Sequence, residues 1–237
     1  MLAPILGTFL AVQAPCTPDA MRLLSEASVR ASRFDLPAAV ASLRIATTCE
    51  SAIVAAWYIQ GLLDARAAAS VGGTAESLAP VRKAITVLEQ LGRNGSVPAE
   101  IGRLVLHAAA AAAQTERDEM RLYLESASQM EFVQEAAGLA GAPIVGALEM
   151  AGVLWLQVDR YVEAQRAYEE AERRYGATHR ITLGVARTSA RLGDTASACA
   201  RYRRLLDEWD SSDMKPPEIT EAHAHVARPE CRPSTAP

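Results

Sequence analysis

The chain has 237 residues, enough to bury a substantial core as one extended domain or two small ones. Its net charge of −4 is small and mixed in sign, and no basic stripe or Lys-rich amphipathic segment is present, so the sequence argues against a nucleic-acid partner and against a membrane-surface helix. Half of the residues are hydrophobic but only 5% are aromatic, which leaves most packing to Ala and Leu and favours close helix–helix contact over a β-sandwich.

The first 15 residues, MLAPILGTFLAVQAP, form an apolar segment without a charged side chain. The segment is too short to span a bilayer, but it has the character of a signal peptide with Val12-Gln13-Ala14 as a cleavage-site-like triplet. Against this interpretation, no basic residue precedes the apolar run and Pro15 would follow the cut. The alternative is an apolar N-terminus packed on the first helix. We expect an exported, periplasmic protein, with a cytoplasmic location as the alternative.

Helical periodicity follows, with turn residues at regular intervals. A first helix is predicted over 18–32, and its partner begins near Pro37, where a missing N–H has no cost. The second pair is SAIVAAWYIQGLLDARAAA and AESLAPVRKAITVLEQLG. Gly72-Gly73 separates these two helices, Thr74 is the expected N-cap of the second, and Gly92 is its expected end.

Three further helix pairs are predicted before the C-terminus. The third consists of PAEIGRLVLHAAAAAAQ and ERDEMRLYLESASQMEFVQEAA, the loop GLAGAP precedes the fourth, and GATHR precedes the fifth. The alanine run in the third pair fits either a close helix contact within the fold or a dimer interface. One last helix is expected over 217–227, followed by a disordered, Pro-rich tail at 229–237. The sequence therefore predicts an all-α domain over 16–228, with short loops between antiparallel helices.

Four cysteines are compatible with disulfides in an exported chain. No two of them have CxxC spacing, so neither a zinc site nor a redox motif is predicted. Cys16 precedes the first predicted helix and Cys49 follows the second, and these two ends lie side by side in an antiparallel helix pair. A disulfide between Cys16 and Cys49 is one interpretation, and two unpaired, partly buried thiols are the other.

Two segments near the C-terminus repeat with a shift of 34 residues, WLQVDRYVEAQRAYEEAERRYG and SARLGDTASACARYRRLLDEWD. The aligned pairs are Asp159 with Gly193, Ala164 with Ala198, Tyr168 with Tyr202, and Ala171 with Leu205. A helix–turn–helix repeat of this length resembles the tetratricopeptide repeat (TPR), most clearly over residues 145–210. The resemblance implies an α-solenoid of about five TPR-like units with a C-terminal capping helix, because one such hairpin cannot bury its own apolar face.

In the TPR family the first helices of the units line a concave groove that holds peptides. In the fifth unit the matching face carries Arg180, Leu183, Arg187 and Arg191, and the three arginines lie on one helical stripe. Guanidinium groups in this arrangement favour an acidic segment or a C-terminal carboxylate as the partner.

Two alternatives apply to these three arginines. They pair with nearby carboxylates such as Glu149 or Asp194, or they stay in water. The family's carboxylate-binding arrangement, which spreads Lys, Asn and Arg over two adjacent units, is not met, because the fourth unit supplies no basic partner.

No motif predicts catalysis, a cofactor or a metal. His223 and His225 point roughly 200° apart on a helix, so they cannot share one metal ion. His107 and His179 have no matched carboxylate or nucleophile in the sequence, and the loop SVGGT follows a helix and lacks GxxxxGK. We therefore expect a chain that is not an enzyme and has no cofactor.

The expected function is a non-enzymatic helical-repeat scaffold that binds a protein or peptide in its concave groove. One alternative is a regulatory or assembly subunit of a larger bacterial signalling or envelope complex. Another is a small-molecule-binding or hydrolytic helical protein that uses His107 in an interior cavity. The last of these requires His107 to face a cavity close to a carboxylate.

Overall fold

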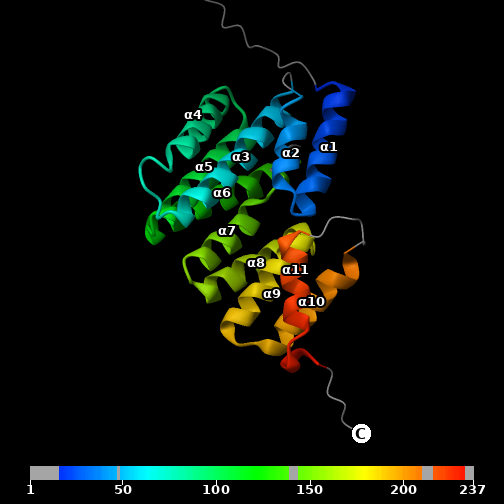
Figure 1. Cartoon of the computed structure of the whole chain (residues 1–237). Helices are drawn as coiled ribbons and strands as arrows, with labels where there is room; N and C mark the ends of the chain where they lie inside the picture. Colours follow the sequence, from blue (N-terminus) through cyan, green and yellow to red (C-terminus); the bar gives the residue numbers. More distant parts are fainter. Residues whose placement is uncertain (1–15, 47–48, 139–143, 210–215, 233–237) are drawn as a thin grey trace, which may run out of the picture.

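The computed structural model describes residues 16–46, 49–138, 144–209 and 216–232, so the signal-like segment at 1–15 lies outside the described residues. Within these ranges the predicted all-α fold is confirmed, with eleven α-helices, one 3-10 helix and no strand (Figure 1). The helices are α1 (Pro18–Ser32), α2 (Leu36–Leu43), α3 (Glu50–Ser70), α4 (Ala79–Arg93), α5 (Val97–Ala113), α6 (Arg117–Ala136), α7 (Ala147–Gln157), α8 (Tyr161–Tyr175), α9 (His179–Leu192), α10 (Thr195–Glu208), α11 (Pro217–Val226) and η1 (Pro229–Cys231).

Local sequence signals set most helix ends. The helix predicted over 18–32 is confirmed, and the Thr17 side chain accepts a hydrogen bond from the Ala20 N–H at its first turn. Asp194 caps α10 in the same way through the Ser197 N–H. Gly193, which ends α9, has φ of 80°, a left-handed conformation that glycine adopts without a steric penalty.

The start of α4 differs from the sequence-based expectation. Thr74 does not cap the helix; its hydroxyl oxygen accepts a hydrogen bond from the Ser77 N–H within a preceding turn, and α4 begins at Ala79. A Thr with a donor three residues ahead stabilises such a turn as well as a helix cap, so the local pattern does not distinguish them. The helix also continues one residue beyond Gly92 and ends at Arg93.

The odd-numbered helices form a continuous row. Contacts join α1 to α3, α3 to α5, α5 to α7 and α7 to α9, and each helix also packs on its neighbour in sequence (Figure 1). At the centre of the row, the alanines of 108–113 are at most 6% exposed apart from Ala110, because α5 contacts α3, α4, α6 and α7. The alanine run is thus used within the chain, where small side chains let several helices approach α5.

Tyr168 on α8 occupies a space that two glycines leave open. A Cβ atom built on Gly152 of α7 would lie 2.7 Å from the Tyr168 ring, and one on Gly184 of α9 would lie 2.2 Å from it. Tyr168 is 3% exposed, so the ring joins three successive helices in the core. Tyr202, which the 34-residue repeat aligns with Tyr168, is also buried, at 2% exposed.

We expect Gly184→Ala to lower the free energy of unfolding by about 1–3 kcal/mol, since the new methyl group displaces a buried ring. The matched control is Gly92→Ala, whose Cβ would lie 3.1 Å from a carboxylate oxygen of the Glu100 side chain, which can move. That change should leave stability equal or raise it by up to about 1 kcal/mol through helix propensity. Urea unfolding followed by circular dichroism measures both, and equal stability of the two variants would contradict the packing argument.

The two ends of the helical row contact each other. The ring of Phe34, in the turn between α1 and α2, stacks on Trp209 at the end of α10 with centroids 5.9 Å apart, and the His179 ring centroid lies 5.3 Å from that of the same indole. Phe34 has φ of 64°, a left-handed conformation that costs a non-glycine residue about 1–2 kcal/mol. The contact between Phe34 and Trp209 therefore depends on a left-handed backbone conformation at Phe34, which is unfavourable for a phenylalanine.

Two disulfides connect elements of the fold. Cys16 is bonded to Cys49, which joins the start of α1 to the start of α3 and is the pair considered from the sequence. Cys199 on α10 is bonded to Cys231 in η1. None of the four cysteines is a free thiol.

The second disulfide corrects the prediction of a disordered tail from residue 229. Pro229–Cys231 form a 3-10 helix, and the Cys231 side chain is 2% exposed because its sulfur is bonded to α10. A Pro-rich composition favoured disorder, but a covalent link to the core outweighs it. Residues 233–237 lie outside the described residues.

Candidate functional site

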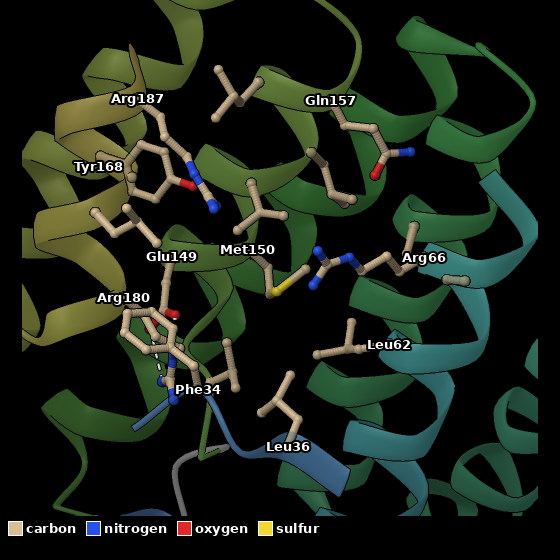
Figure 2. A pocket seen from close by; sticks show the side chains of 18 of the residues that line it. Phe34, Leu36, Leu62, Arg66, Glu149, Met150, Gln157, Tyr168, Arg180 and Arg187 are labelled. Atoms are coloured by element: carbon tan, nitrogen blue, oxygen red, sulfur yellow. Dashed lines mark hydrogen bonds and ion pairs between the residues drawn. The ribbon is translucent and has the colours of Figure 1, made fainter. Parts of the chain in front are cut away.

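A cavity of about 330 Å³ lies on the face formed by α3, α5, α7 and α9 (Figure 2). Phe34 and Leu36 from the N-terminal hairpin and Glu218 from α11 also line it, so residues from both ends of the row contribute. Most of its wall is aliphatic, and the principal residues are Leu36, Leu62, Leu63, Met150, Leu154 and Leu183. A concave apolar site with a few polar groups is the usual form of a ligand pocket.

Arg180, one of the three stripe arginines, lines this cavity but is already paired. Its Nε donates to Glu149 Oε1 at 2.5 Å and its Nη2 to Glu149 Oε2 at 3.1 Å, with a further hydrogen bond to the Ile144 carbonyl. The side chains are 14% and 6% exposed. The sequence alternative in which Glu149 pairs with an arginine thus describes this residue.

Arg187 also lines the cavity and is paired with a residue that the sequence did not indicate. Its Nε and Nη2 donate to both carboxylate oxygens of Glu221 on α11, at 2.9 and 2.5 Å. Burial alone would raise the pKa of Glu221, but hydrogen bonds from Arg187 and the Tyr202 hydroxyl hold that pKa below its ordinary value. Glu221 is therefore ionised at neutral pH and neutralises Arg187.

The other two predicted groove residues lie in different places. Leu183 lines the cavity and is 2% exposed, whereas Arg191 does not line it. The Arg191 guanidinium lies over the Tyr161 ring, 5.9 Å from its centroid. The stripe of three arginines therefore does not present three available cations to one ligand.

Sequence reasoning missed three polar groups of the cavity, Arg66, Tyr168 and Glu218. Figure 2 shows Arg66 extending from α3 toward the cavity, and among the described residues it has no ion pair. The Tyr168 side chain, on the opposite wall, also lines the cavity, and burial raises the pKa of its hydroxyl. That hydroxyl therefore stays protonated and can donate. The sequence did contain one indication of the Arg66 position. Arg66 follows Leu62 by four residues, so both side chains lie on the same face of one helix.

The histidines do not form a catalytic arrangement with this cavity. His107 stacks on Tyr123, with centroids 4.8 Å apart, and does not line the cavity. Burial lowers the pKa of His107, which favours its neutral form. The hydrolytic alternative required His107 to face the cavity, and the structure places it elsewhere.

Over the described ranges, one group of side chains has the spacing of metal ligands: Cys199, His225 and Cys231, whose ligand atoms lie within 4.8 Å of one another. Both sulfurs belong to the disulfide, and His225 stacks on Tyr202 with centroids 4.3 Å apart. With the sulfurs oxidised, only the imidazole remains as a donor, so this group serves as a covalently fixed part of the core.

A buried carboxyl group fixes the start of α7, next to the cavity. Glu131 on α6 is 1% exposed and accepts hydrogen bonds from the Ala147 N–H at 3.0 Å and from the Tyr175 hydroxyl. Burial is the largest influence and raises the pKa of Glu131, against the hydrogen bonds that lower it. The folded protein therefore favours the neutral carboxyl more than the unfolded chain does.

We expect Glu131→Gln to change the pH dependence of stability. Since the folded pKa is raised, the stabilising contribution of Glu131 is complete below about pH 4 and is lost as the pH rises through the folded pKa. The wild type should therefore lose stability relative to the variant over this range, by about 1.4 kcal/mol for each unit of the shift. Urea unfolding between pH 4 and 8 measures the difference. Glu125→Gln, exposed on the same helix, is the control, and an equal pH trend in both variants would contradict the assignment.

No family model, curated protein or solved structure matches the chain. In the described part of the chain, no helix is both long and apolar enough to cross a bilayer.

Proposed function

We propose that the chain is a non-enzymatic scaffold, an α-solenoid of TPR-like units, that binds a protein or peptide through the face formed by α3, α5, α7 and α9. The 34-residue repeat and the row of odd-numbered helices support the architecture. The observation that carries the function is the apolar cavity at the centre of this face, which can accept an aliphatic or aromatic side chain of a partner.

The partner that suits this face has an apolar anchor residue beside acidic groups. Arg180 and Arg187 are neutralised by Glu149 and Glu221, so Arg66 is the cation that remains for an acidic segment or a C-terminal carboxylate. We therefore place the recognition of charge on α3 and not on the α9 stripe.

A panel of fluorescent peptides tests this proposal. Each carries one Leu or Phe anchor flanked by acidic, neutral or basic residues, and fluorescence polarisation measures binding. We expect acidic peptides to bind best and Met150→Trp, which fills the cavity, to weaken binding at least about tenfold. Val162→Trp, on an exposed position of α8, is the control. Absence of binding by every peptide, or equal binding to the filled variant, would reject the proposal.

We also propose that the chain works in an oxidising compartment, as the apolar N-terminal segment and two disulfides both suggest. Intact mass of the protein from its native source, with alkylation before and after reduction, tests this. Four alkylated thiols without reduction would place the chain in a reducing compartment and reject this location.

A further inference from the structure

Among the charged groups of the cavity, one cation, Arg66, and one anion, Glu218, have no ion pair with a described residue. Five charged side chains line the cavity. Of these, Arg180 is paired with Glu149, and Arg187 is paired with Glu221, which does not line the cavity. Arg66 and Glu218 have no ion pair among the described residues. They belong to different helices, α3 and α11, and Figure 2 shows the Arg66 guanidinium turned toward Met150 at the centre of the cavity.

The hydroxyl of Tyr168 is a second polar group without a partner in this part of the chain. Other buried tyrosines have one: Tyr58 donates to the Val145 carbonyl at 3.0 Å and Tyr202 to Glu221 at 2.7 Å. Tyr168 is 3% exposed as a residue and lines the cavity, and no hydrogen bond joins its hydroxyl to a described residue. The hydroxyl is not one of the fully buried polar atoms that lack a partner, so the cavity leaves it accessible, and an acceptor on a ligand can replace water there.

The form of the cavity restricts its occupant. Its volume of about 330 Å³ is about twice that of the ~150 Å³ cavity that holds a benzene molecule. Phe34, whose ring stacks on Trp209, forms part of the wall, so residues from both ends of the chain enclose the site. The wall is mostly aliphatic. Its donors without a hydrogen bond to a described residue include the Arg66 guanidinium, the Tyr168 hydroxyl and the Gln157 amide, which suit an anion, and Glu218 is the unpaired acidic group on the same wall.

We propose that this cavity binds a free aliphatic carboxylate of about eight to ten carbons. The carboxylate lies between the Arg66 guanidinium and the Tyr168 hydroxyl, with Arg187 adjacent, and the hydrocarbon chain packs on Leu62, Met150 and other aliphatic residues of the wall. This proposal goes beyond the scaffold function and does not require it. The carboxylate would occupy the cavity whether or not a protein partner binds to the same face.

Isothermal titration calorimetry with decanoate tests the proposal, with decanol and decylamine as neutral and cationic molecules of the same chain length. We expect decanoate to bind best. Arg66→Gln should weaken decanoate about ten- to a hundredfold and leave decanol unchanged, and Tyr168→Phe should weaken decanoate about fivefold. Arg66 is exposed and the Phe ring keeps the Tyr168 packing, so both variants should fold, which circular dichroism checks. Arg166→Gln, an exposed arginine on α8 outside the cavity, is the matched control.

Three results would overturn the inference: no heat from decanoate, equal affinity for decanoate and decanol, or unchanged decanoate affinity in Arg66→Gln. A fourth result would also overturn it: decanoate does not bind, but a peptide that ends in leucine with a free C-terminal carboxylate binds through Arg66, and the same peptide with a C-terminal amide does not. That result would assign the carboxylate to a peptide. That fourth result leaves the scaffold function intact. Decanoate binding together with failure of every peptide in the panel would support this inference and reject the scaffold function, so the two proposals fail separately.

Discussion

Replacement of Glu149 by Leu is expected to lower the free energy of unfolding by about 3–5 kcal/mol. The Arg180 guanidinium would then be left buried without its carboxylate, and removal of one member of a buried ion pair costs more than the pair itself contributes. Arg180 cannot reach water easily, because its side chain is 14% exposed and one Nη atom is buried without a partner even in the wild type.

The double variant Glu149→Leu/Arg180→Met distinguishes the cost of leaving the Arg180 charge unpaired from the loss of the attraction between the two ions. Since neither charge remains, we expect most of the stability to return. Glu89→Gln is the surface control: its ion pair with Arg93 is exposed on α4, and its loss should cost less than about 1 kcal/mol. Urea unfolding of all four proteins measures the series. A double variant as unstable as Glu149→Leu alone would contradict the buried-charge explanation.

Loss of the Cys199–Cys231 disulfide is the second large effect. Replacement of both residues by Ala should lower the free energy of unfolding by about 3–4 kcal/mol, because the bond closes a loop with a sequence separation of 32. α11 lies within that loop, so we also expect faster amide hydrogen exchange in α11 than in α5 of the same variant.

The Cys16→Ala/Cys49→Ala variant is the matched comparison, since its sequence separation of 33 predicts nearly the same change. Urea unfolding under non-reducing conditions gives the global values, and mass-spectrometric hydrogen exchange locates the opening. Unchanged stability in both variants would show that packing, and not the covalent links, holds the two ends of the chain.

Helices could be predicted from the sequence because their signals are local. The periodicity of 18–32 predicted the first helix with its correct ends, and the 34-residue repeat aligned Tyr168 with Tyr202, both of which are buried. Thr74 was misleading because a turn and a helix N-cap use the same side-chain hydrogen bond. Local patterns thus determine which segments are helical better than where each helix begins.

The candidate site was harder to predict because its groups meet only in the folded chain. Arg187 and Glu221 are 34 residues apart in sequence, and nothing near either residue indicates their pairing. Arg66 lies in a different predicted pair from the α9 arginines, so a search along one helix could not find it. The three-arginine stripe was a correct observation of helical geometry, but tertiary contacts decide which of its charges remain available.

The contact between Phe34 and Trp209 also has a consequence for folding. The helix pairs with extensive contacts are neighbours or next neighbours in sequence, whereas this contact joins residues 175 positions apart. Contacts of short sequence separation form early and long loops close late, so the helical pairs should assemble before the two ends meet. The cavity then takes its final shape only in the last step of folding. By the same reasoning, its wall at Phe34 should be the first to open in the native state, and a bound molecule would slow that opening.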